Sequence, residues 1–282
     1  MTVVRKHEGG AVPVRARVSQ AEWQARVDLA ACYRLVAHHG WTDLVFTHIS
    51  ARVPGAPEDG APSMRDAQEG GQRAGRPGPA EHFLLNPFGH LFDEVTASSL
   101  VKVDLDGRIV DETPYDIHPA GFVIHSAVHA ARPDVNCVIH THTEAGMAIS
   151  ALECGLLPLT QHAQLFHGRV GYHDYEGLAT DIDERQRLVA DLGDNPVMIL
   201  RNHGLLVTGR TVPEAFSLMH HLEKACAAQL AAMATGAKLT LPTAVVSAKT
   251  ARQGMAPDTP IGKREWPGLL RLLDRIDPSY RD

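Results

Sequence analysis

The alternation of helix and strand is clearest in residues 119 to 146, which read PAGFVIHSAVHAARPDVNCVIHTHTEAG. Apolar residues at helical spacing predict a helix from Pro119 to about Ala131. The apolar run from Val135 to His140 predicts a buried strand, and a second helix is expected from about Thr143 to Cys154. We therefore expect a domain in which helices pack against a sheet.

Similar signals lie on both sides of this segment. Ser19 and Glu22 form a capping box, which predicts a helix from there to about His39. Strands are expected at Asp43–Ser50, Phe83–Leu85, Val101–Asp106, Val197–Leu200 and Leu205–Val207, and further helices at Asp181–Leu192 and Thr211–Thr235. Because the chain has neither a regular β-α-β period nor a glycine-rich nucleotide motif, we predict a layered α/β sandwich rather than a doubly wound nucleotide-binding sheet.

Composition divides the chain into one domain with flanking segments. Residues 1–18 form a polar N-terminal extension, residues 19–237 the domain, and residues 238–282 a polar, Pro-rich tail with one apolar patch, which packs on the domain or on a neighbouring subunit. Of the 27 residues from 54 to 80, 11 are Pro or Gly. Such a segment buries too little apolar surface to offset its ordering entropy, so we expect a flexible insertion, with an active-site lid as the alternative.

Charge and hydropathy exclude several classes of function. The 282 residues carry a net charge of -6, so there is no basic field that would attract nucleic acid. No apolar run approaches the roughly 20 residues of a membrane span, and the amino terminus lacks the apolar segment of a secretory signal. We expect a cytoplasmic protein with a small-molecule substrate, whose four single cysteines are buried, reduced thiols.

The chain contains 17 histidines, and three of them stand where metal ligands could be held. His140 and His142 are two residues apart at the end of a predicted strand, so both rings can face the same side and reach one metal ion. His203 lies in a turn before Gly204, where the backbone would fix its position. Taken alone, these histidines could equally be polar residues that close a strand and a solvated turn.

Four stretches carry a resemblance to the class II aldolase and adducin family. They are PFGHLFDEVTASSLVKVDLDG (Pro87 to Gly107), the segment from Pro119 to Gly146, VGYHDYEG (Val170 to Gly177) and RNHGLLVTGRTVPEAF (Arg201 to Phe216). The PAGFVIH form is most similar to the adducin head domain and to a group of bacterial aldolase-like proteins. The resemblance implies a single three-layer α/β/α domain with a central mixed, mainly antiparallel sheet, and a homotetramer with sites at subunit interfaces. It also implies a divalent metal, usually Zn²⁺ with Mn²⁺ or Fe²⁺ as alternatives, at positions matched here by His140, His142 and His203.

Two departures from the aldolase pattern concern catalysis and substrate. The aldolases' acid/base glutamate corresponds to Gly121, which can neither transfer a proton nor bind a metal. The Gly-Asn-x-Ser phosphate stretch corresponds to Thr47-His48-Ile49-Ser50, and Phe88, Pro119 and Ala120 stand where hydroxyl residues are expected. A phosphate dianion would lose most of its donors there, so a sugar phosphate is disfavoured.

Another side chain must then carry protons, and three histidines are candidate catalytic residues: His118, His48 and His125. His118 precedes Gly121 by three residues, His125 follows it by one helical turn, and we place His48 in a substrate-side loop. For His125 a hydrogen bond across the core is an equally good interpretation.

These features predict a metal-dependent carbon–carbon lyase acting on a small unphosphorylated hydroxy- or oxo-acid. A metal held by three neutral imidazoles could stabilise an enediolate as a Lewis acid, in aldol cleavage or in decarboxylation. Decarboxylation has the advantage that carbon dioxide leaves without a base. Two alternatives stay open: a three-histidine Fe(II) oxygenase, and a non-catalytic adducin-like interaction module.

Overall fold

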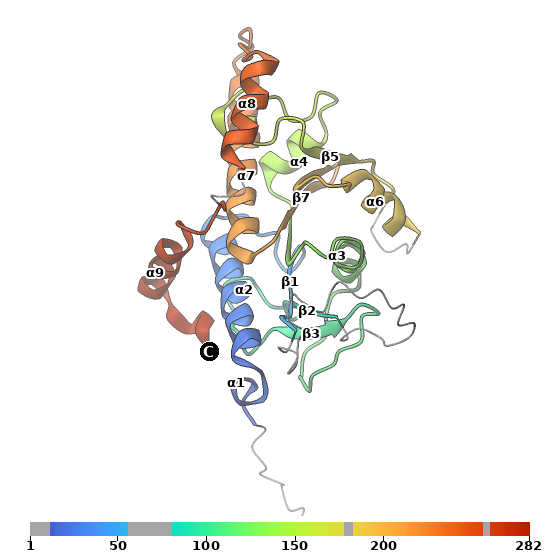
Figure 1. Cartoon of the computed structure of the whole chain (residues 1–282), viewed down its shortest axis with the longest axis vertical. Helices are drawn as coiled ribbons and strands as arrows, with labels where there is room; N and C mark the ends of the chain where they lie inside the picture. The colour runs from blue at the N-terminus through green and yellow to red at the C-terminus, as the bar shows by residue number, and fades with distance from the viewer. Residues whose placement is uncertain (1–11, 56–80, 178–182, 256–259) are drawn as a thin grey trace, which may run out of the picture.

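The computed structural model describes residues 12–55, 81–177, 183–255 and 260–282 (Figure 1). Most of the expected insertion at 54–80, most of the N-terminal extension and the predicted helix start at Asp181 lie outside the described residues. Among the residues that are described, no helix is long and apolar enough to cross a membrane.

A seven-stranded sheet forms the centre of the domain. Its strands are β1 (His48–Arg52), β2 (His82–Leu85), β3 (Val101–Asp104), β4 (Cys137–Thr141), β5 (Val170–His173), β6 (Val197–Leu200) and β7 (Gly204–Gly209), in the spatial order β3-β2-β1-β4-β7-β6-β5. All neighbouring strands are antiparallel except β5 and β6, which are parallel. The predicted mixed, mainly antiparallel sheet is therefore confirmed.

Helices cover both faces of this sheet, which gives the three layers seen in Figure 1. One face carries α2 (Gln20–His38), α4 (Glu144–Ser150) and α7 (Val212–Ala234), and the other carries α3 (Pro119–Ala131) and α6 (Glu184–Leu192). Helix α9 (Trp266–Ile276) packs on the outside of α2. The remaining helical segments are α1 (Val14–Arg17), α5 (Gln161–Gln164), α8 (Ala244–Gly254) and the 3-10 turn η2 (Pro278–Arg281). The α/β/α prediction is thereby confirmed.

Side chains on β4 alternate between the two helical layers, and this alternation positions the functional residues. Cys137 and Ile139 belong to the core formed with α2 and α7, whereas Val138 packs with apolar residues of α3 and α6. Because residues two apart on a strand share a face, His140 lies on the α3 side and Thr141 on the α7 side. Strand β4 thus presents an imidazole to the α3 side and a hydroxyl to the α7 side.

The ends of the helices agree with the capping signals in most places. The Ser19 hydroxyl accepts from the backbone N–H of Glu22 at 3.1 Å, as the capping box predicts. The helix expected to reach Cys154 ends instead at Ser150. In the C-terminal segment, α9 buries Trp266 and Leu273 in the domain's own core, and the indole N–H of Trp266 donates to Asp28 at 2.9 Å.

One expectation about the cysteines is wrong. Cys32, Cys137 and Cys226 are buried, but Cys154 is exposed. The residue lies in the loop after α4, because this helix is shorter than its apolar pattern suggested.

Candidate metal site

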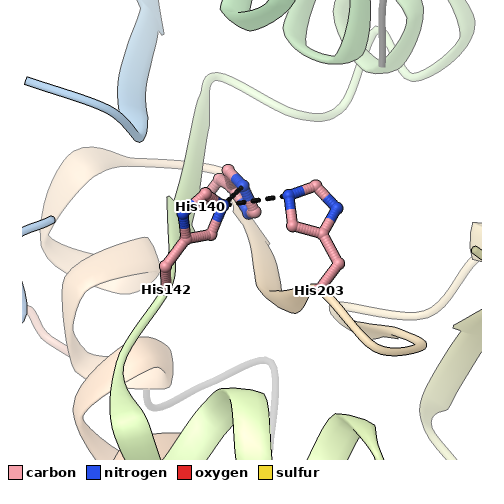
Figure 2. A group of neighbouring side chains, drawn as sticks. All are labelled: His140, His142 and His203. Atoms are coloured by element: carbon pink, nitrogen blue, oxygen red, sulfur yellow. Dashed lines mark hydrogen bonds between the residues drawn. The ribbon is translucent and has the colours of Figure 1, made fainter. Parts of the chain in front are cut away.

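Three histidines from the centre of the sheet converge on one point (Figure 2). His140 belongs to β4, His142 follows directly after it, and His203 lies in the turn between β6 and β7. That turn is tight: a Cβ atom at Gly204 would lie 2.3 Å from the carbonyl oxygen of Thr141, so only glycine fits this close approach. The backbone therefore holds His203 against the end of β4.

Hydrogen bonds fix which ring nitrogens face the centre. The Nδ1–H of His140 donates to the carbonyl of Leu205 at 2.9 Å, and the Nδ1–H of His142 donates to the carboxylate of Asp43 at 3.0 Å. In each neutral ring the proton is thereby on Nδ1, which leaves a lone pair on Nε2. Metal-binding histidines commonly have this arrangement, in which the ring nitrogen that does not bind the metal donates its proton to a carboxylate or a backbone carbonyl.

The Nε2 atoms lie unusually close to one another for groups that carry lone pairs. Nε2 of His142 is 2.8 Å from Nε2 of His140 and 2.9 Å from Nε2 of His203. Facing lone pairs repel unless a proton or a cation lies between them. A tetrahedral ion with bonds near 2.0–2.1 Å holds its donors about 3.4 Å apart, so a small rearrangement of the three rings, whose ligand atoms lie within 4.8 Å of one another, would accommodate it. The donor set fits a divalent metal.

Burial keeps two of the three rings, those of His140 and His203, neutral. It lowers the pKa of His140 well below its ordinary value and that of His203 to about 4, and the neighbouring histidines lower both further. Neutral imidazoles are the forms that bind metals.

His48 lies beside this group and fills the space of a missing side chain. Antiparallel pairing of β1 with β4 places it opposite His140. A Cβ atom at Gly121 would lie 2.5 Å from Cγ and Cδ2 of His48. A side chain at position 121 and the ring of His48 therefore cannot both occupy this space. The expectation that His48 lies in a loop is wrong, because it begins strand β1 and is buried.

The other two candidate proton carriers differ in environment. The ring centre of His118 is 5.2 Å from that of His48 and 4.7 Å from that of Phe88, and burial lowers its pKa. His125 is completely buried, with a pKa lowered to about 3 by burial, and its Nδ1 is 2.7 Å from the hydroxyl of Ser50. Its ring centre lies 6.0 Å from that of His48. His118 is thus the more accessible of the two.

A small cavity beside His203 brings in residues that no sequence pattern connected with the site. Its lining includes His173, Tyr175, Glu184 and Arg201. His173 lies at the end of β5, where Asp191 is 2.7 Å from its Nδ1. Asp43 also had no sequence signal as a partner of His142, since 99 residues separate the two.

Comparison with known proteins identifies the family. Residues 27–230 match the Class II Aldolase and Adducin N-terminal domain, and the chain belongs to this family. An aldolase II superfamily protein from Pseudomonas syringae is 51% identical, with a TM-score of 0.84 over 96% of this chain and 100% of that one.

Two more distant relatives are an aldolase and an adducin. L-fuculose 1-phosphate aldolase from Glaciozyma antarctica PI12 is 26% identical, with a TM-score of 0.74 over 93% of each chain. Alpha-adducin from Rattus norvegicus is 40% identical over 271 residues, which cover 91% of this chain but 33% of the adducin. The chain thus spans about a third of the adducin's length.

Proposed function

We propose that His140, His142 and His203 bind a divalent metal ion and that the protein is a metal-dependent carbon–carbon lyase. The observation that carries this proposal is the convergence of three Nε2 atoms, two of them in rings whose Nδ1–H groups are held by Leu205 and Asp43. Zn²⁺ suits three imidazole donors with an open position, and Mn²⁺ or Fe²⁺ can use the same donors. When bound, such an ion supplies Lewis-acid stabilisation of negative charge on a substrate oxygen.

We assign proton transfer to His118 and His48. Burial lowers the pKa of both rings, so both are neutral at pH 7. Among the described residues, Nε2 of His48 has no hydrogen-bond partner. The hydroxyl of Ser50 holds Nδ1 of His125, whose ring centre lies 6.0 Å from that of His48. We assign His125 the role of supporting the ring of His48.

The substrate we propose is a small unphosphorylated hydroxy- or oxo-acid. The side chain of Phe88 is 45% exposed and packs against His118, at a position where a phosphate site would present a hydroxyl. Phe46 is equally exposed and also contacts His118. Phenylalanine side chains offer no donors to a dianion, whereas they can pack against the carbon skeleton of a substrate.

The test is elemental analysis of protein purified without added metal or chelator, followed by a screen of hydroxy- and oxo-acids. We expect about one Zn²⁺ or Mn²⁺ per chain, lost in His203→Ala together with turnover. His162→Ala is the matched control, since this exposed histidine contacts His221 on another surface. Metal and turnover unchanged in His203→Ala would refute the proposal.

Two other results would replace this function by a different one. Bound iron with activity that requires oxygen would identify a three-histidine oxygenase. Absence of both metal and turnover in the wild type would favour an adducin-like interaction module. Light scattering in solution tests the homotetramer that we propose as the assembly.

A further inference from the structure

We propose that Glu223, on α7, is a positioning residue that sets the geometry of the histidine site from the opposite face of the sheet. This inference rests on the proposed metal site. Glu223 cannot itself reach the ion, because it contacts the α7 side of β4, whereas His140 faces α3.

The contacts of Glu223 bracket His142 in the sequence His140-Thr141-His142-Thr143. The hydroxyl of Thr141 donates to Oε1 of Glu223 at 3.0 Å. The hydroxyl of Thr143 lies 2.8 Å from Oε2 and 3.0 Å from Oε1 of the same carboxylate. One side chain therefore holds both neighbours of the ligand that lies between the other two.

The Glu223 carboxylate is buried, and its removal would leave the hydroxyls of Thr141 and Thr143 without this acceptor. Its residue is only 5% exposed, and a buried carboxylate is stable only with hydrogen-bond donors. Thr143 also accepts from the backbone N–H of Gly146 at 3.0 Å, which caps α4. Glu223 thus joins α7 to the end of β4 and to the start of α4.

His142 is then fixed from two directions. Asp43 orients its ring through Nδ1, while Glu223 holds the backbone on both sides through the threonine hydroxyls. Since Nε2 of His142 lies within 3 Å of both other Nε2 atoms, a shift of this residue changes every distance in the site. Outer groups of this kind typically change metal affinity by about 10–100-fold.

The experiment measures Co²⁺ binding to metal-free protein, using affinity and the visible absorption bands, which report coordination geometry. We expect Glu223→Ala to weaken binding by about 10–100-fold and to shift the bands. The control on the same helix is Gln229→Ala: Gln229 is fully buried and bonds to Leu157 N–H at 2.7 Å and Gly155 carbonyl at 2.8 Å, away from the histidines. This control is expected to lose stability but to keep the wild-type affinity and spectrum.

A second pair of variants tests the same link if Glu223→Ala does not fold. Thr141→Val removes only the hydroxyl and is expected to weaken Co²⁺ binding, whereas Thr141→Ser retains the donor and is expected to restore it. Wild-type affinity and bands in Glu223→Ala and Thr141→Val, or an equal loss of affinity in Gln229→Ala, would overturn the positioning role alone. A wild-type protein that binds neither Co²⁺ nor Zn²⁺ would overturn the metal site and this role together.

Discussion

Replacement of Gly121 by alanine tests whether His48 occupies the space of a side chain at position 121. The added Cβ would lie 2.5 Å from two ring carbons of His48 and 2.6 Å from Nδ1. Favourable contacts between carbon atoms lie at about 3.5–4.0 Å, so the ring must retreat by about 1 Å. His48 is 7% exposed, which leaves it little room to do so.

The expected free energies follow from two opposing effects. Overpacking of a buried site costs about 1–3 kcal/mol, and the higher helix propensity of alanine returns about 1 kcal/mol. Gly121→Ala should therefore lower the free energy of unfolding by up to about 2 kcal/mol in the wild type. In a His48→Ala background the clash is gone, and the same substitution should be neutral or stabilising.

Urea denaturation of the wild type, Gly121→Ala, His48→Ala and the double variant measures this coupling directly. We expect a coupling free energy of about 1–3 kcal/mol. Gly268→Ala is the matched control, because Gly268 is also the third residue of a helix but its Cβ would meet nothing closer than 3.6 Å. Additive effects within about 0.5 kcal/mol, or equal stability of the two glycine variants, would refute the reasoning.

Three further predictions concern buried charge, acid stability and thiol reactivity. Arg26 is 1% exposed and pairs with Glu22 at 2.9 Å and with Asp111 at 3.2 Å. Arg26→Ala leaves these carboxylates unpaired and should lower the free energy of unfolding by about 3–5 kcal/mol. A loss below about 1 kcal/mol in urea denaturation would contradict this expectation. Burial lowers the pKa of His129 from 6.5 to about 3, so the unfolded chain takes up the proton first and stability falls by up to about 1.4 kcal/mol per pH unit as the pH drops from 6.5 toward 3. His129→Gln should flatten this acid limb in denaturation curves measured across that range, and an unchanged slope would show that His129 does not contribute. A thiol reagent should modify Cys154 rapidly and the three buried cysteines only after unfolding, and mass spectrometry of the labelled peptides would expose any other order.

Most of the central sheet could be predicted because its signals are local. The apolar runs around Val138 and Ile199 and the capping box at Ser19 depend on residues within a few positions of one another. Strand β5 escaped prediction because its four residues, which include Gly171, have little pattern of their own. It is a strand because it pairs with β6 and is covered by α6.

The site was predictable only in part for the same reason. The histidines at 140 and 142 are two residues apart, His203 stands before a turn glycine, and the resemblance to the family joined the three in one site. The partners that orient them come from distant segments: Glu223 lies 82 residues from Thr141, and Asp43 lies 99 residues from His142. The relation between His48 and Gly121 depends on how β1 packs against α3, which no spacing in the sequence expresses.

The parallel alignment of β5 with β6 has a consequence for redesign of the protein. Both strands end at the cavity beside His203, and residues 174–177 border that cavity without belonging to the strand that carries His140. Exchanges in this short segment can change the shape and polarity of the cavity while the hydrogen bonds of His140 and His142 stay intact. Libraries built there would vary the lining of this cavity at little risk to the hydrogen bonds that orient His140 and His142.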